Sequence, residues 1–307
     1  MYYFETNALY QLASLLRDFP ALASDVCSSF LAILELLSGL TENNWLVRKR
    51  ILSTLQSNSI LIATATPAEI LTAGFDCVEL NAQGHRDRIA KLAEVVGETE
   101  SYSQAQSQLQ ELGATTLDDL KSDDQFIRDH GELIGNGVRY RNDVPRESRV
   151  RIREAYEASA SQDFAQRYET ARQEYIHRLA IMFASKLFPE EVDHTTSVAE
   201  IEDSYNGLCD DFFTAKAFLE TEHILEGINP GKNDNFDIAH LIYVGPNILV
   251  TDDKKLLSIA NSIRGGMAIS VSELRSTLAR QEASCTEGPS FPSVSQASRD
   301  SITTRRM

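Results

Sequence analysis

The chain of 307 residues has few cysteines and no long hydrophobic run. Its four cysteines are scattered without a CxxC pair, which argues against a zinc site or a disulfide framework and predicts reduced thiols. No apolar run approaches the ~18–20 residues that span a bilayer, so we expect no membrane segment. The first residues lack the basic and apolar regions of a secretory signal, and we therefore expect a cytoplasmic protein.

Basic residues are also scarce. The chain has 29 lysines and arginines against 45 aspartates and glutamates, a formal net charge of −16. This balance excludes a protein whose whole surface binds nucleic-acid phosphates, because such binding is mostly electrostatic. It does not exclude a nuclease, since a metal-binding acidic cluster itself adds negative charge.

Strand and helix signals alternate at both ends of the chain, whereas the middle is helical. Strands are expected at residues 2–4, 59–63, 247–250 and 267–271. We therefore predict an α/β fold with a central parallel sheet built from both ends of the chain. The predicted division is a sheet domain at 1–84 and 196–275, a helical insertion at 85–195, and a disordered tail at 276–307.

Two helices are predicted near the N-terminus, the first from the spacing of its leucines. The first helix should start at Thr6 or Asn7, either of which suits an N-cap, and should end at Pro20. The second is predicted from about Ser28 to Gly39.

Several carboxylates occupy positions that solvation explains poorly. Glu5 and Asp253 each follow a predicted strand, and the carboxyl ends of parallel strands form the edge where such sheets bind ligands. Glu35 is the sole charged residue of an otherwise apolar helix, where a buried carboxylate needs a cation or strong donors. Asp234 and Asp237 begin a short apolar helix. If these carboxylates converge they repel one another, and a bound Mg²⁺ or Mn²⁺ would relieve the repulsion.

Each of these carboxylates also has an ordinary structural interpretation. Asp253 fits the N-cap of the next helix, and Asp234 and Asp237 fit a turn and a cap. Glu5 fits a surface position at a strand end, and Glu35 could pair with an arginine of the helix that follows it. Their joint placement favours a site, because one sheet edge can gather all of them.

Four segments resemble the PIN-domain nucleases and occur in the order of that family. They are Phe4-Glu-Thr-Asn7, Ile33-Leu-Glu-Leu-Leu37, Asn233-Asp-Asn-Phe-Asp-Ile-Ala-His-Leu241 and Leu249-Val-Thr-Asp-Asp-Lys-Lys-Leu256. The family opens with a strand and an Asp-Thr-Asn-like triplet, places a glutamate on an early helix, and ends with an aspartate helix and a Thr-x-Asp strand end. The resemblance implies a three-layer α/β/α fold around a parallel sheet.

The resemblance also implies a metal-dependent ribonuclease that hydrolyses RNA at a Mg²⁺ or Mn²⁺ site. Carried over position by position, it implies the catalytic and metal-binding carboxylates Glu5, Glu35, Asp237 and Asp253, with Asp234 as a further candidate ligand and Asn7 and Thr251 as supporting polar residues. Glu5 is one methylene longer than the aspartate usual at its position. In such a site the metal lowers the pKa of a bound water, which attacks phosphorus.

The helical middle contains a local excess of arginine. Six arginines lie between residues 139 and 153, and the candidates for contact with an RNA backbone are Arg139, Arg141, Arg146 and Arg149. The plainer interpretation is a solvated helix face whose arginines pair with neighbouring glutamates.

Two functions other than ribonuclease stay open. One is a catalytically weak PIN-like module that binds through its helical insertion, with an antitoxin, another protein or a second copy of the chain as candidate partners. The other is a carboxylate-pair hydrolase such as a glycosidase, which needs no metal.

His240 lies near Asp237 in sequence, and we expect it to pack or bond locally rather than to act as a base.

Overall fold

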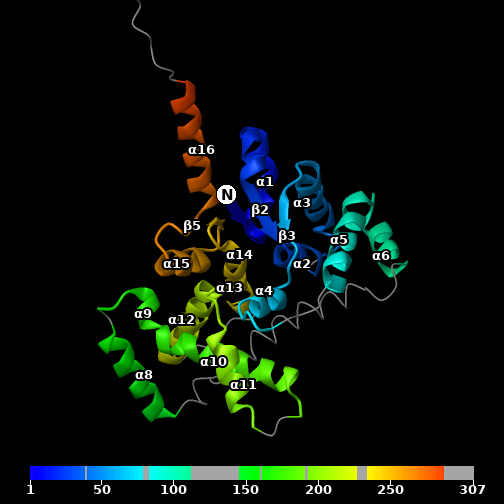
Figure 1. The fold of residues 1–307 in the computed structure, drawn as a ribbon. Helices are drawn as coiled ribbons and strands as arrows, with labels where there is room; N and C mark the ends of the chain where they lie inside the picture. The colour runs from blue at the N-terminus through cyan, green and yellow to red at the C-terminus, as the bar shows by residue number, and fades with distance from the viewer. Residues whose placement is uncertain are drawn as a thin grey trace, which may run out of the picture.

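A five-stranded parallel sheet lies at the centre of the computed structural model, which describes residues 1–38, 40–78, 83–111, 145–159, 161–190, 193–226 and 234–286. Its strands are β1 (Tyr2–Phe4), β2 (Val26–Ser29), β3 (Leu61–Ala63), β4 (Ile248–Val250) and β5 (Ala268–Ile269). They pair in the order β3-β2-β1-β4-β5. Figure 1 labels β2, β3 and β5 of this sheet among the surrounding helices. Both ends of the chain therefore contribute strands to one α/β sheet, as the sequence predicts.

Helices make up most of the remaining described structure. The N-terminal part contains α1 (Thr6–Asp18), the 3-10 helix η1 (Pro20–Asp25), α2 (Phe30–Ser38), α3 (Trp45–Ser57) and α4 (Pro67–Ala73). The middle contains α5 (Gln83–Glu98), α6 (Tyr102–Glu111), α8 (Arg146–Ala158), α9 (Phe164–Arg167), α10 (Glu169–Leu187), α11 (Thr195–Asp203) and α12 (Asp210–Glu226). The C-terminal part contains α13 (Asp234–Ala239), α14 (Leu241–Val244), α15 (Lys254–Ile263) and α16 (Val271–Thr286). None of the helices in the described ranges has the length and apolar character needed to cross a membrane.

Two hydrophobic clusters pack against the sheet, one on each face. Tyr3 and Leu249 belong to one cluster, whereas their chain neighbours Phe4 and Val250 belong to the other. This division follows from the alternation of side chains along a strand. The cluster around Phe4 includes side chains of α1, α2, α3, α5 and α6, and the cluster around Tyr3 includes side chains of α10 to α15. The helices of the middle are thus divided between the two faces.

Strand β2 replaces the start of a predicted helix. We expected a helix from about Ser28, but Val26–Ser29 form β2 and α2 begins at Phe30. All four β2 residues are buried, because the strand lies between β1 and β3. A strand buried on both faces lacks the alternation of apolar and polar residues that separates a strand from a helix in sequence.

The start of the predicted C-terminal tail is helical. We expected no regular structure from residue 276, yet α16 continues to Thr286. Leu274 is fully buried, and the Arg275 guanidinium hydrogen-bonds the Asp18 carboxylate at the end of α1. These contacts anchor the first turn of α16, from which the helix continues by its own backbone hydrogen bonds. The rest of the predicted tail lies outside the described residues.

Candidate functional site

The residues that follow β1 and β4 meet at the carboxyl edge of the sheet. Phe4 is in register with Val250, and the backbone N–H of Glu5 donates to the Val250 carbonyl at 3.4 Å. Glu5 and Thr251 are therefore neighbours, and both are buried. This is the edge at which the sequence predicts a ligand site.

The Glu5 carboxylate caps helix α1. Its two oxygens accept backbone N–H hydrogen bonds from Asn7 at 2.7 Å and from Ala8 at 3.1 Å. The prediction that Thr6 or Asn7 is the cap is therefore wrong, because the extended backbone of Glu5 lets its longer side chain reach the free N–H groups. Burial raises the pKa of Glu5, and the charge of His240 acts in the opposite direction. Glu5 is thus a buried structural carboxylate beside the site, not a surface residue, while the Asn7 side chain is exposed.

Glu35 projects from α2 toward the same edge. Its Oε2 atom accepts hydrogen bonds from the Thr6 hydroxyl and from His240 Nε2, the latter at 3.1 Å. Neither arginine of α3 forms an ion pair with this carboxylate in the described structure, and the Arg48 guanidinium instead donates to the backbone carbonyls of Glu35 and Leu36, at 2.9 and 2.5 Å. Oε1 of Glu35 accepts no hydrogen bond from the described residues, and the side chain is 22% exposed. One oxygen is therefore fixed and the other is available to a ligand.

His240 links the carboxylate edge to the protein core. Its Nδ1 atom lies 2.7 Å from the Tyr3 hydroxyl, which in turn lies 2.7 Å from Ser29 Oγ. Burial lowers the pKa of His240, but the hydrogen bond to Glu35 and the charges of Glu35, Glu5 and nearby Asp237 raise it above its ordinary value. We expected His240 to pack or bond locally; its side chain is buried, but its partners lie 205 and 237 residues away in the chain.

Asp237 has the most perturbed carboxyl group of the edge. Burial, and then the charges of Asp253 and Glu35, raise its pKa from 3.8 to about 7, while His240 lowers it in part. Its side chain forms no hydrogen bond or ion pair with the described part of the chain. Perturbed and unpaired carboxyl groups of this kind are typical of functional sites.

Asp253 has the structural role that its sequence position suggests. Its carboxylate caps α15 by accepting the backbone N–H of Leu256 at 2.7 Å. The Thr251 hydroxyl oxygen accepts the backbone N–H of Asp253 at 3.0 Å, which fixes the turn after β4. Because Asp253 also raises the pKa of Asp237, the cap interpretation and the site interpretation apply to the same carboxylate.

Asp234 differs from Asp237 in having a lysine and a histidine as side-chain partners. Its carboxylate lies 2.9 Å from Lys255 Nζ and 3.1 Å from His223 Nε2. Of Asp234 and Asp237, Asp237 is therefore the candidate ligand that forms no ion pair with the described residues.

Three of the five predicted carboxylates line one small pocket. The pocket is formed by Leu219, Asp234, Asp237, Ile238, Asp253, Lys255, Leu256 and Ile259. Glu5 and Glu35 do not line it, but Glu35 acts electrostatically on Asp237 and on Glu5. Glu35 and Asp253 therefore both act electrostatically on Asp237, whereas Glu5 is buried beside these three carboxylates.

The donor set fits a hard divalent cation in chemical type. Carboxylate oxygens are the ligands that Mg²⁺ and Mn²⁺ prefer, and the unpaired charge of Asp237 would be relieved by a cation. Within the ranges that the structure describes, no group of three or more His, Cys, Asp or Glu side chains is close enough to form a ready metal centre. Closing one around an ion therefore requires side-chain movement, for which the second oxygen of Glu35 is available.

The predicted basic cluster is described only in its second half. Arg139 and Arg141 lie outside the described residues, whereas Arg146 and Arg149 lie in the first two turns of α8. Helix α8 has no buried residue and packs against α12, where the Arg153 guanidinium donates to the Leu225 carbonyl at 3.2 Å. Helix α12 in turn supplies Leu219 to the carboxylate pocket.

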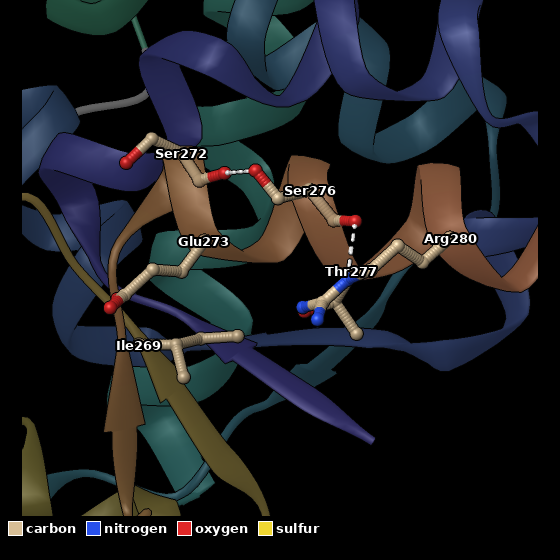
Figure 2. Close-up of a pocket in the computed structure, with 6 residues that line it drawn as sticks. All are labelled: Ile269, Ser272, Glu273, Ser276, Thr277 and Arg280. Carbon is tan, nitrogen blue, oxygen red and sulfur yellow. Dashed lines mark hydrogen bonds between the residues drawn. The ribbon is translucent and has the colours of Figure 1, made fainter.

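A second, open pocket of about 360 Å³ lies along α16, away from the carboxylates (Figure 2). It is lined by Ile269, Ser272, Glu273, Ser276, Thr277 and Arg280. Its one carboxylate, Glu273, accepts hydrogen bonds from the backbone and hydroxyl of Ser270, at 2.7 and 2.8 Å. With that acid engaged as a cap, this pocket has no arrangement of groups that favours chemistry.

No protein-family model matches the chain, and neither a curated protein nor a solved structure is detectably similar to it. The assignment of a function therefore depends on the fold, the carboxylate edge and the sequence motifs.

Proposed function

We propose that this chain is a PIN-like ribonuclease that depends on Mg²⁺ or Mn²⁺. Its five parallel strands with helices on both faces agree with the three-layer fold that the motif resemblance implies. The observation that carries the proposal is the shared pocket of Asp237 and Asp253, in which burial and then the charges of Asp253 and Glu35 raise the pKa of Asp237 to about 7. A carboxylate held in that state is suited to exchange its proton for a metal ion.

Different residues of the chain would bind the metal ion and the RNA phosphate. Asp237 and Asp253 would hold the ion, and Glu35 would reach it with the oxygen that accepts no hydrogen bond. Lys255, which lies beside Asp234 at the pocket, would meet the phosphate of a bound RNA strand. When bound, the metal would lower the pKa of a water molecule and would neutralise charge on the leaving oxygen.

A second candidate, a PIN-like module that binds RNA or protein without cutting, has specific support. Glu5 gives both oxygens to the cap of α1, and Asp234 forms an ion pair with Lys255 and contacts His223. Two of the predicted ligands thus have other partners, and this would weaken a metal site. The experiment below separates the two candidates.

The test is cleavage of a labelled single-stranded RNA by the purified full chain with Mn²⁺, compared with Asp237→Asn. We expect the substitution to reduce the cleavage rate by about 100-fold or more, because one ligand charge is lost at near-constant volume. Asp252→Asn is the matched control: it removes a neighbouring carboxylate charge that lies outside the pocket and accepts the Val271 N–H at 3.1 Å.

Cleavage that EDTA abolishes, that Asp237→Asn loses and that Asp252→Asn keeps would support the nuclease. RNA binding without cleavage above the Asp237→Asn background would favour the binding module. RNA cleavage by the wild type that persists in EDTA would contradict both candidates.

A further inference from the structure

A continuous hydrogen-bond chain runs from the core to the Glu35 carboxylate. It passes from Ser29 Oγ to the Tyr3 hydroxyl at 2.7 Å, from there to His240 Nδ1 at 2.7 Å, and from His240 Nε2 to Glu35 Oε2 at 3.1 Å. Ser29, Tyr3 and His240 are between 0% and 2% exposed, whereas Glu35 is partly exposed. The chain thus has a rigid buried end and a carboxylate at its accessible end.

The direction of these hydrogen bonds is fixed at the Glu35 end. A carboxylate only accepts, so His240 Nε2 must carry the proton that it shares with Glu35. With a neutral imidazole, Nδ1 accepts from the Tyr3 hydroxyl, which accepts from Ser29; with imidazolium, the two inner bonds reverse. The neutral imidazole lets the Ser29, Tyr3 and His240 donors each meet an acceptor of this chain, whereas imidazolium leaves the Ser29 hydroxyl proton without one in it; the ring orientation is the same in both cases.

Aromatic packing holds the ring in that orientation. The Tyr3 ring stacks on Tyr243 with centroids 6.2 Å apart and planes 7° apart. Phe236 meets the His240 ring edge-on, with centroids 6.4 Å apart. Neither ring can turn without losing both its packing and its hydrogen bond.

The position of Glu35 needs such support, because Asp237 repels it. Thr6 and His240 both bind Oε2, so they hold the carboxylate at the edge while Oε1 stays uncommitted. We propose that His240, fixed by Tyr3, is a positioning residue that orients Glu35 toward the ligand held by Asp237 and Asp253. This inference deepens the proposed function and rests on it, since it assigns a supporting shell to one of the proposed metal ligands.

The test uses Tyr3→Phe, which removes only the hydroxyl that holds His240 Nδ1. Tyr243→Phe is the matched control: it removes the hydroxyl of another buried tyrosine, which donates to the Ala65 carbonyl at 2.8 Å and forms no hydrogen bond with Ser29, Tyr3, His240 or Glu35. Mn²⁺ affinity of the full chain is measured by titration calorimetry. We expect Tyr3→Phe to weaken Mn²⁺ binding by about 10- to 100-fold and Tyr243→Phe to change it less than about 3-fold.

The nitrogen signals of the His240 ring provide a readout that does not need metal. In the metal-free protein, Tyr3→Phe should shift the Nδ1 resonance and Glu35→Gln should shift the Nε2 resonance. If these shifts occur but the wild-type chain binds no Mn²⁺, the proposed function fails while the link from Tyr3 through His240 to Glu35 stands. Unshifted resonances, or equal Mn²⁺ affinity in Tyr3→Phe and the wild type, would overturn the positioning role.

Discussion

Glu5 shows how one added methylene changes the task of a residue. An aspartate directly after β1 would present its oxygens close to the strand end, whereas the longer Glu5 side chain turns back onto the first N–H groups of α1. Because Glu5 is buried, an unpaired charge there would be costly, and the hydrogen bonds from the α1 backbone compensate for that cost. The extra carbon thus favours a capping role over a ligand role.

Loss of this cap should be visible as a loss of stability. We expect Glu5→Ala to lower the free energy of unfolding by about 1–2 kcal/mol, because two N–H groups at the start of α1 lose their acceptor. Glu5→Gln should lose less, since its amide oxygen still accepts. Urea denaturation followed by circular dichroism would measure both, and an equal loss in the two variants would contradict the capping role.

The Asp237 carboxyl should give the metal-free protein a pH-dependent stability. Its pKa is about 7 in the folded chain and ~3.9 in an unfolded one, so the folded state binds more protons between these values. The free energy of unfolding should therefore decrease as the pH rises from about 4 to about 7. Asp237→Asn cannot ionise and should remove this decrease.

Thermal melts in EDTA would measure this effect. The melting temperature of Asp237→Asn should exceed that of the wild type at about pH 8 and should be close to it at about pH 4.5. The same difference at both pH values would mean that ionisation of Asp237 is not the cause.

At the scale of elements, structure that follows from local sequence was predictable. Helix α4 is an example, because Pro67 lies in its first turn and Thr66 and Glu69 form a capping box, and both are local sequence signals. The turn from β4 to α15 was predictable for the same reason, since Asp253 is both a cap and a site candidate. By contrast, β2 was missed because all four of its residues are buried and its identity depends on β1 and β3.

The supporting shell of the site could not be predicted from local sequence. His240 meets Tyr3 and Glu35 only because the sheet pairs the two ends of the chain. The one local signal was its position three residues after Asp237, which places both side chains near the same edge. The carboxylates were found because charges in apolar segments are conspicuous, whereas a tyrosine inside a strand is not.

Helix α16 gives a test of how the C-terminal element is held. Leu274 of α16 is fully buried in the hydrophobic cluster that also contains the apolar side chains of α1. We expect Leu274→Ala to lower the free energy of unfolding by about 2–5 kcal/mol, because it removes buried methyl groups and leaves a cavity. Leu46→Ala, at a position 57% exposed, should change it by less than about 0.5 kcal/mol. Chemical denaturation of the three proteins would decide, and similar values for the two variants would show that α16 is not docked.

For the whole molecule, the net charge of −16 limits how RNA can be held. Divalent ions at the carboxylates and a local set of arginines are the two means of offsetting the repulsion. Helix α8 packs on α12, and α12 supplies both Leu219 to the pocket and His223 to the ion pair with Asp234. The arginines of α8 are therefore joined to the carboxylate site through a single helix.

Replacing Arg146 and Arg149 together by alanine should weaken binding of single-stranded RNA and make it less sensitive to salt. Each phosphate contact contributes about 0.7 to the slope of log affinity against log salt, so the loss of two contacts should reduce the slope by about 1.4.

Arg17→Ala with Arg50→Ala is the matched control, because it makes the same charge change on α1 and α3, which belong to the other face of the sheet. Fluorescence anisotropy at several salt concentrations, with Ca²⁺ in place of Mn²⁺ to hold the carboxylates occupied, would measure the slopes. Equal slopes for the two double variants would mean that only net charge matters and that the arginines of α8 are a solvated helix face.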